Sequence, residues 1–419
     1  MQSTFDVAVI GGGPAGMMSA IRAAEIGARV VLLEKNPILG KKLLITGGGR
    51  CNILHALFDM RLLTEKYGKK GKSLFSAFSR FGVQETWDFF ESRGLKLKIE
   101  EENRAFPTSN SAEDVQKTLI AEMKKYGVTI LLNAPVVSIE ESHGLIKKVV
   151  LKNAQIEAKN YILATGGKSR PETGSTGDGF VWAKKLGHTV VTPDPALVPV
   201  TIRNPWIKKV EGISLKGVRL SIFQDGKKYD SKVGKMLFTG VGLSGPLVLN
   251  MSKSVGEFLK HGQVLLSLDL FPTLDLGAVD RKLLNLFDTG KNRMIKNVIG
   301  AIVEIRLGHE LLALAGIPDR TELHQVTREQ RMTLAKLLKD IPMTVSGLLG
   351  ADKAIVTGGG IDLKEVDFAT MRSKRIKNLF LAGDILDFDR PSGGFSLQIC
   401  WTTGYLSGDN AGTASVSGA

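Results

Sequence analysis

The N-terminal segment constrains the fold of this chain more than any other stretch. Phe5–Ile10 is an apolar, β-branched run that predicts a buried strand, and the Ala- and Met-rich residues 14–26 predict a helix. A second apolar strand is expected at 29–33, directly before Glu34. Between the first strand and the helix stand three glycines in G-x-G-x-x-G spacing, Gly11, Gly13 and Gly16. This order predicts a Rossmann-like βαβ unit and hence an α/β fold.

Each glycine of this motif has a physical role in nucleotide binding. Gly11 permits a tight turn, Gly13 lets the backbone approach a pyrophosphate, and Gly16 lets the helix pack closely on the strand. The N-terminus of the helix offers unpaired N–H groups to the phosphates. Glu34, 18 residues beyond Gly16, is placed to accept hydrogen bonds from a ribose. The motif predicts a dinucleotide site, occupied by either FAD or NAD.

Two later segments favour FAD. Residues 161–167, "YILATGG", and 378–387, "NLFLAGDILD", are strands that run into Ala-Thr-Gly and Gly-Asp. Together with the N-terminal motif, they resemble flavoproteins of the glutathione-reductase-like superfamily. The resemblance implies that Asp384 binds the ribityl–pyrophosphate part of FAD. Since no second G-x-G-x-x-G with an acidic partner is present, NAD(P)H is expected only as an electron donor without a Rossmann domain of its own.

Six segments along the chain narrow the family. Residues 40–52, "GKKLLITGGGRCN", resemble the signature of the YhiN/BaiN-like flavoproteins, a family also called aminoacetone oxidase-like or NAD(P)/FAD-dependent oxidoreductases. The match continues through residues 104–115, 163–188, 237–252, 354–367 and 381–398. The resemblance implies a FAD-binding domain made from residues 1–190 and 345–419. Within the insertion, alternating runs predict a β-rich, barrel-like subdomain at 191–276, and helical periodicity predicts a helical subdomain at 277–344.

The glycine-rich loop invites a catalytic interpretation. The resemblance places it along the flavin ring, where Gly47–Gly49 would allow close backbone approach; the alternative is a turn that only fixes loop shape. Arg50 could stabilise negative charge on reduced flavin or on substrate. Cys51, beside this arginine, could have a lowered pKa and act as a proton donor or redox partner, or it could be a small buried hydrophobe.

The cofactor-binding residues that the resemblance implies come from both ends of the chain. They are Gly11, Gly13, Pro14, Ala15, Gly16, Glu34, Lys35, Lys42, Gly48, Gly49, Arg50, Cys51, Val137, Ala164, Thr165, Gly166, Gly383, Asp384, Gly393, Gly394 and Phe395. No histidine precedes His55, so the covalent flavin histidine of some related enzymes has no counterpart, and FAD is expected to bind non-covalently. The six histidines lack metal-ligand spacing, which predicts no metal site.

Charge bears on the substrate. Fifty-six Lys and Arg against 42 Asp and Glu give +14, and the insertion, residues 191–350, carries 22 against 15. Basic stretches at 61–72 and 204–219 suit a polyanion, although a solvated basic surface is the plain alternative. Aromatic residues make up only 6%, and no interleaved aromatic–basic motif of the RNA-binding modules is present.

Three function classes stay open. The resemblance implies reduction of a uridine in large-subunit ribosomal RNA to dihydrouridine, oxidation of aminoacetone, or bile-acid conversion. The charge favours the RNA; a small-molecule oxidase or ene-reductase is the second hypothesis. A flavin-bearing RNA-binding or redox-sensing protein without turnover is the third. Residues 174–180, "GSTGDGF", are also similar to fumarate reductase and ketosteroid dehydrogenase flavoproteins, which move hydride between flavin N5 and a carbon–carbon bond.

Four positions depart from the family pattern. Gly240 stands where His is expected, Asp384 where Glu is expected, and Ser396 where Asn is expected. Arg390 stands where a small residue is usual. Asp384 preserves the carboxylate, so these departures concern the substrate more than the flavin.

Cysteine usage and hydropathy indicate the compartment. With only Cys51 and Cys400 and no C-x-x-C, neither a disulfide framework nor a thiol-pair redox centre is expected. The apolar runs are far shorter than the roughly 18 residues that span a bilayer, and the N-terminus lacks a basic region typical of a signal peptide. A cytoplasmic protein without a membrane segment is therefore expected.

Overall fold

The structure is a computed structural model that describes residues 5–290, 292–350, 352, 354 and 356–416. The chain divides into two compact units. The first unit is Met1–Pro195 with Ala354–Ala419, and the second is Ala196–Lys353.

A seven-stranded sheet organises the first unit. Its strands, in spatial order, are β19 (Val366–Asp367), β20 (Arg372–Ser373), β21 (Leu379–Leu381), β10 (Ala158–Leu163), β1 (Phe5–Ile10), β2 (Val30–Leu33) and β6 (Thr129–Leu131). The five strands from β21 to β6 are parallel, and β1 is fully buried except at its first residue. Their carboxyl ends therefore meet at one edge, where open α/β sheets bind ligands.

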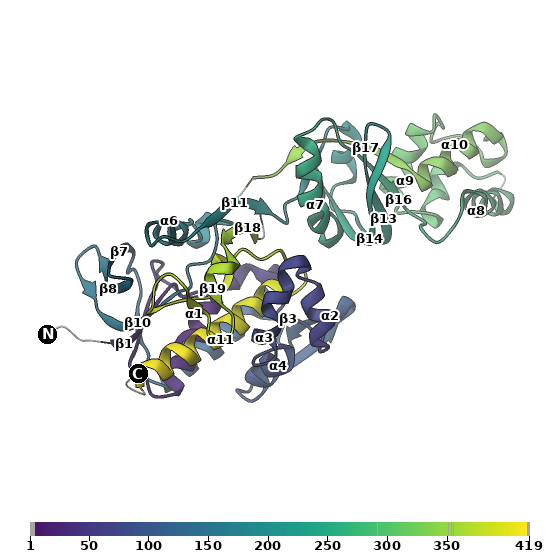
Figure 1. The fold of residues 1–419 in the computed structure, drawn as a ribbon. Coiled ribbons are helices and arrows are strands. Elements are labelled where there is room, and N and C mark those ends of the chain that lie inside the picture. Colours follow the sequence, from purple (N-terminus) through teal and green to yellow (C-terminus); the bar gives the residue numbers. More distant parts are fainter. Residues whose placement is uncertain (1–4, 291, 351, 353, 355, 417–419) are drawn as a thin grey trace. The chain divides into compact units, whose positions relative to one another are not determined.

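Two helices from opposite ends of the chain pack against each other beside this sheet. They are α1 (Pro14–Glu25) and α11 (Phe395–Val416), purple and yellow in Figure 1. Gly404 and Gly408 of α11 make the close approach possible, because a Cβ there would lie 2.6 and 2.3 Å from the carbonyl oxygens of Ala15 and Ser19. This pairing brings the start of α11 to the nucleotide motif.

Smaller elements surround the sheet in the first unit. The helices are α2 (Met60–Glu65), α3 (Phe75–Phe78), α4 (Val83–Glu91), α5 (Ala112–Lys125) and α6 (Asp178–Lys185). The strands form three small sheets: β3 (Leu54–His55), β5 (Arg104–Pro107) and β4 (Leu97–Glu100); β7 (Val136–Ser142), β8 (Leu145–Leu151) and β9 (Gln155–Ile156); and β11 (Val190–Ala196) with β18 (Val356–Ile361). The 3-10 helices η1 (Leu43–Gly48), η4 (Pro171–Thr173) and η10 (Gly383–Ile385) carry site residues, and η2 (Gly68–Leu74) follows α2.

The second unit is a closed barrel with helices. The strand order is β12 (Val200–Ile202), β15 (Gly242–Ser244), β14 (Lys227–Thr239), β13 (Ser214–Gln224), β16 (Leu265–Asp269) and β17 (Ile341–Leu348). Its helices are α7 (Pro246–Leu259), α8 (Leu276–Thr289), α9 (Ile305–Leu314) and α10 (Arg328–Lys339). One hydrophobic core is shared by the strands and helices; for example, it includes Leu266 of β16 and Leu334 of α10.

The domain boundaries differ from those the sequence predicted. The predicted return to the first unit at 345 falls inside β17, which pairs with β12 and β16 in the barrel, and the first unit resumes at Ala354. At the other boundary, β11 pairs with β18 of the first unit, so the insertion starts at Ala196 rather than 191. The stretches predicted as separate β-rich (191–276) and helical (277–344) subdomains form one compact unit, because they bury their apolar faces against each other.

None of the described helices has the length and apolar character needed to cross a bilayer. Among the described residues, no cluster of three or more His, Cys, Asp or Glu side chains is arranged to hold a metal ion.

Candidate cofactor site

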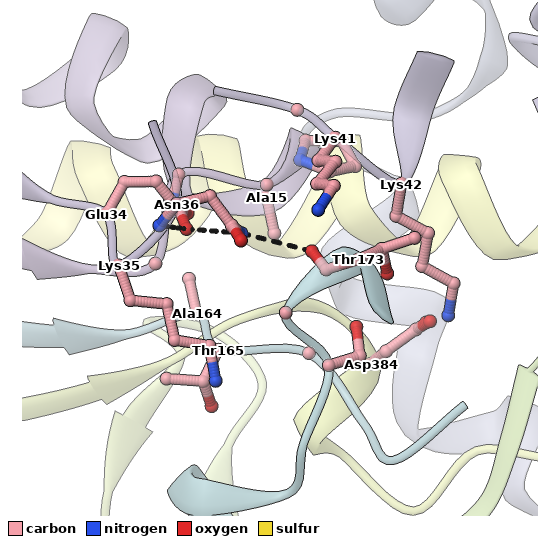
Figure 2. Close-up of a pocket in the computed structure, with 18 of the residues that line it drawn as sticks. Ala15, Glu34, Lys35, Asn36, Lys41, Lys42, Ala164, Thr165, Thr173 and Asp384 are labelled. Atoms are coloured by element: carbon pink, nitrogen blue, oxygen red, sulfur yellow. Dashed lines mark hydrogen bonds between the residues drawn. The ribbon is translucent and has the colours of Figure 1, made fainter. Parts of the chain in front are cut away.

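A cavity opens at the carboxyl edge of the main sheet, within the first unit. Its walls come from the ends of β1, β2 and β10, the first turn of α1, the segment 40–46, the segment 173–178, and the first residues of α11. Figure 2 shows side chains from these elements around the cavity, with Glu34 and Lys42 on opposite sides of the view. The site is therefore built from segments that the sequence separates by up to several hundred residues.

The glycines of the N-terminal motif fit a nucleotide. Gly11 has φ +108°, and a Cβ there would lie 2.6 Å from the carbonyl oxygen of Ala164; a Cβ at Gly16 would lie 1.8 Å from the oxygen of Gly11. At Gly13, in contrast, no atom lies within 4 Å of the Cβ position. Gly13 is the N-cap of α1 and no side chain caps it, so the first N–H groups of the helix are available to a pyrophosphate.

The carboxylate of Glu34 is held in place at the end of β2. Its Oε2 accepts from the N–H of Gly12 at 2.8 Å, and its Oε1 accepts from the N–H and Nδ2 of Asn36 at 2.8 and 2.7 Å. Asn36 Nδ2 also donates to the carbonyl oxygen of Thr173 at 3.1 Å (Figure 2). Because a carboxylate oxygen accepts about two hydrogen bonds, Glu34 can still receive a ribose hydroxyl on Oε2.

Thr165 lines the cavity, but its hydroxyl is shielded from it. The Oγ1 atom is buried without a hydrogen-bond partner among the described residues and lies beside Gly179 of α6, where a Cβ would meet it at 2.0 Å. The open backbone at Gly13 and the oriented Glu34 are the features that fit a dinucleotide such as FAD.

Three lysines, Lys35, Lys41 and Lys42, line the cavity. Lys35 Nζ lies 2.7 Å from Asp178 Oδ2, so this lysine is paired. Lys42 Nζ donates to Ser169 Oγ at 2.7 Å and forms no salt bridge with a described carboxylate. Burial lowers the pKa of the Lys42 ammonium, while Asp384 acts to raise it. Lys42 is thus a cation whose charge is available to an anionic ligand.

The predicted role of Cys51 as a thiol of lowered pKa is wrong. The side chain is fully buried, and burial raises its pKa to about 12. It does not line the cavity, and it belongs to the hydrophobic core of the unit. The alternative interpretation, a small buried hydrophobe, describes it.

Arg50 is engaged outside the cavity. Its guanidinium lies over the ring of Phe106, 4.2 Å from the centroid, and forms an ion pair with Glu100 and a hydrogen bond with Asn110. These contacts anchor the glycine loop to β4 and β5. A role of Arg50 in charge stabilisation stays a prediction.

The structure gathers about half of the predicted cofactor residues around the cavity. Those that line it are Gly11, Gly13, Pro14, Ala15, Glu34, Lys35, Lys42, Ala164, Thr165, Gly166 and Asp384. Those that do not are Gly16, Gly48, Gly49, Arg50, Cys51, Val137, Gly383, Gly393, Gly394 and Phe395. Of these, Gly16 contributes indirectly, because it packs against the cavity residue Gly11.

The prediction of Val137 as a cavity residue is displaced by one position along the chain. Val137 is 60% exposed, whereas the preceding residue, Val136, lines the cavity. Both lie at the start of β7. Because successive side chains of a strand point to opposite faces, Val136 faces the cavity and Val137 points away from it.

Sequence reasoning also missed residues that line the cavity. They are Gly12, Asn36, Lys41, Thr46, Pro135, Val136, Thr173, Gly174, Ser175, Thr176, Gly177, Asp178, Trp182, Ser396, Leu397 and Cys400, among others. The sequence motif at 174–180 was the signal that could have placed the first five of these residues, 174–178, in the predicted site. Cys400 is buried and also lines the cavity.

Comparison with known proteins identifies the family. Residues 5–410 match the family described as HI0933-like protein Rossmann domain. The chain belongs to this family. The chain is accordingly a FAD-dependent oxidoreductase, and the residues of the cavity fit a flavin dinucleotide.

Two relatives of different activity are about equally similar. The 3-dehydro-bile acid delta(4,6)-reductase of Clostridium scindens is 29% identical over 407 residues, which cover 96% of this chain and 98% of that protein. The ribosomal RNA dihydrouridine synthase of Escherichia coli is 28% identical over 409 residues, with 96% of each chain covered. Identity alone therefore does not choose between an RNA and a small molecule.

Solved structures share the fold at low identity. The open conformation of a flavocytochrome c3 fumarate reductase has a TM-score of 0.54 at 18% identity, covering 99% of this chain and 79% of that one. The 3-ketosteroid-delta4-(5alpha)-dehydrogenase of Rhodococcus jostii also has a TM-score of 0.54, at 15% identity, with 98% of each chain covered.

Proposed function

We propose that this oxidoreductase reduces the C5=C6 bond of a uridine in large-subunit ribosomal RNA to dihydrouridine, with NAD(P)H as the electron donor. FAD, which Gly13 and Glu34 would help to hold, would supply the hydride that C6 takes, and C5 would take a proton. The overall reaction converts uridine, NAD(P)H and one proton into dihydrouridine and NAD(P)⁺.

The observation that carries the proposal is a basic segment fixed beside the cofactor cavity. We call Met60–Leu74, which contains α2 and η2, the basic segment. Its exposed cations are Arg61, Lys66, Lys69 and Lys72, and none of them forms a salt bridge with a described carboxylate. Cations in such an arrangement are available to the phosphates of a nucleic acid.

Two contacts anchor this segment to the loop before α11. Lys70 Nζ lies 2.6 Å from Asp387 Oδ1, three residues after the cavity residue Asp384. The hydroxyl of Tyr67 donates to the carbonyl oxygen of Phe395 at 2.9 Å, directly before the cavity residue Ser396. The exposed lysines are therefore held by their neighbours at a fixed place relative to the cavity, as an enzyme that positions a polymer requires.

A uridine in folded RNA has to be unstacked before it can enter such a site. The cost is lowest where the base is already single-stranded. We therefore expect the enzyme to prefer a protein-free or immature transcript over an assembled subunit.

A second candidate function is reduction of a small enone or steroid acid. It is favoured by the 29% identity to the bile-acid reductase across almost the whole of both chains. In that case the exposed cations of the basic segment would be a solvated surface, and their removal would leave turnover unchanged.

An anaerobic reoxidation experiment separates the candidates. The flavin of the purified holoenzyme is reduced with NAD(P)H, and its absorbance is followed after addition of either large-subunit rRNA transcript or a 3-oxo-Δ4 steroid acid. Reoxidation by the transcript alone supports the RNA proposal. Reoxidation by the steroid acid alone overturns it in favour of the second candidate, and reoxidation by neither indicates a flavin protein without turnover on these substrates.

A further inference from the structure

A buried arginine stands behind the cofactor cavity. The side chain of Arg390 is 1% exposed, on the loop between η10 and α11. Its Nη2 lies 2.8 Å from Asp384 Oδ1, its Nη1 donates to the carbonyl oxygen of Phe388 at 2.8 Å, and its Nε donates to Ser396 Oγ at 3.2 Å. A guanidinium this deep in a protein is stable only when it is paired and hydrogen-bonded, and these contacts meet that need.

Both side-chain partners of Arg390 belong to the cavity wall. Asp384 and Ser396 line the cavity, and Arg390 joins them from the protein side. The three residues therefore form one linked unit of charge and hydrogen bonds at this part of the wall.

The electrostatic consequence concerns the ligand. Without Arg390, only Lys42 would oppose the negative charge that Asp384 places at the wall of a cavity that receives a negatively charged cofactor. With Arg390, the carboxylate and guanidinium cancel, and Lys42, which interacts electrostatically with both, gives this end of the cavity a net positive charge. Charges beside a flavin tune its electronic properties.

We propose that Arg390 is a positioning residue that neutralises Asp384 and thereby raises the reduction potential of the bound FAD. Two-electron reduction with uptake of one proton adds negative charge to the flavin, so a site that is less negative favours the reduced form. The proposal rests on the assignment of FAD to this cavity and is independent of the substrate, since Arg390 acts on the cofactor.

A merely structural role for Arg390 makes a different prediction. If the arginine only ties the loop to α11, then loss of either partner of the ion pair loosens the same loop. The potential would then move in the same direction in both variants, or in neither. Charge compensation instead requires shifts of opposite sign.

The test compares R390Q, D384N and the double variant R390Q/D384N as purified holoproteins. The flavin reduction potential is measured by anaerobic titration against a reference dye. We expect R390Q to lower the potential, D384N to raise it, and the double variant to lie between them, near the wild type. Shifts of the same sign in the two single variants, or no shift in either, would overturn the proposal.

Three further variants, R390K, R390M and S396A, keep the test decisive. If R390Q does not retain flavin, R390K and R390M are compared after reconstitution with excess FAD. R390K preserves the positive charge and must stay closer to the wild-type potential than R390M does, while D384N alone must still raise it. S396A removes one hydrogen bond to Arg390 without changing charge, so it must shift the potential less than either charge variant. No RNA is present in this experiment, so a negative result leaves the proposed reaction standing.

Discussion

The N–H of Gly12 donates to Oε2 of Glu34 over 2.8 Å and so joins the turn of the nucleotide motif to the end of the second strand. The acid is thus oriented by the protein itself rather than by the ligand. Such preorganisation lowers the entropic cost of binding, because the carboxylate does not have to be ordered when the cofactor arrives.

Loss of this carboxylate should weaken FAD binding strongly. We expect E34A to raise the dissociation constant of FAD by about tenfold or more, since each charge-assisted hydrogen bond that is removed contributes roughly 1.5–3 kcal/mol. The measurement is flavin fluorescence on titration of apoprotein. E113A, which removes an exposed glutamate of α5, is the matched control and should bind FAD as the wild type does. Equal affinity of E34A and E113A would remove Glu34 from the site.

Two glycines of one motif should respond differently to alanine. In G13A the added methyl has no atom within 4 Å and φ is −78°, so the apoprotein should keep its thermal stability while FAD affinity falls. In G16A the methyl would lie 1.8 Å from the oxygen of Gly11, so the apoprotein itself should be destabilised. Calorimetry of both apoproteins, with FAD titrations, checks this contrast. A G13A protein that binds FAD normally would contradict the position assigned to the pyrophosphate.

Cys51 should be dispensable for turnover. Because the thiol is buried and its pKa is raised to about 12, C51A is expected to retain activity within about twofold and to lose some stability through the cavity left behind. The native wild-type protein should also resist alkylation at this residue. A loss of activity of about a hundredfold with a normal flavin spectrum would restore the catalytic interpretation.

A buried, hydrogen-bonded histidine–glutamate pair predicts how stability depends on pH. His188 Nδ1 lies 3.0 Å from Glu365 Oε2, and the side chain of His188 is fully buried. Burial lowers the pKa of His188, which Glu365 only partly offsets, so protonation favours the unfolded chain and stability declines as pH falls below about 6.5.

The carboxylate of Glu365 affects stability over a lower pH range than His188 does. Burial opposes ionisation of Glu365, but hydrogen bonds from Arg375, Thr189 and His188 outweigh it and lower its pKa to about 2. Its stabilisation is present above the unfolded pKa of about 4.3 and is lost as pH falls toward 2. Urea melts between about pH 3 and 8 should show both declines in the wild type. The lower decline should be smaller in E365Q, in which other carboxylates of lowered pKa, such as Asp6 and Asp178, still contribute. Stability that is constant across this range would refute the account.

The basic segment should govern RNA affinity. We expect K69E/K72E to weaken binding of an rRNA transcript and to reduce its salt dependence, by about 0.7 in slope for each phosphate that the protein no longer neutralises. K124E/K125E, at the exposed end of α5, makes the same change in total charge and is the control. Filter binding over a range of salt concentrations distinguishes them. Equal weakening in both variants would indicate general attraction rather than a specific surface.

The sequence predicted the nucleotide motif well because its determinants are local. The turn at Gly11, the packing of Gly16 and the position of Glu34 all follow from short-range steric rules within one βαβ unit. The FAD cofactor and the family were likewise recognisable from motifs, and the comparison with known families confirms them.

What the sequence could not predict depends on contacts between distant or irregular segments. The direction of the side chain of Val137 depends on where β7 begins, and a shift of one residue reverses it. The burial of Cys51 depends on the packing of the loop after η1. The link between Asp384, Arg390 and Ser396 crosses an irregular loop that has no periodicity, so neither spacing nor propensity reveals it.

Detection of the product tests the proposed reaction most directly. Large-subunit rRNA transcript, free of protein and modification, is incubated anaerobically with FAD-loaded enzyme and NADPH, digested to nucleosides and analysed by mass spectrometry, with K69E/K72E and a reaction without protein as controls. The account predicts a dihydrouridine peak for the wild type, a much smaller peak for K69E/K72E, and none without protein. Absence of the peak, with the flavin shown to be reduced, would contradict the RNA substrate.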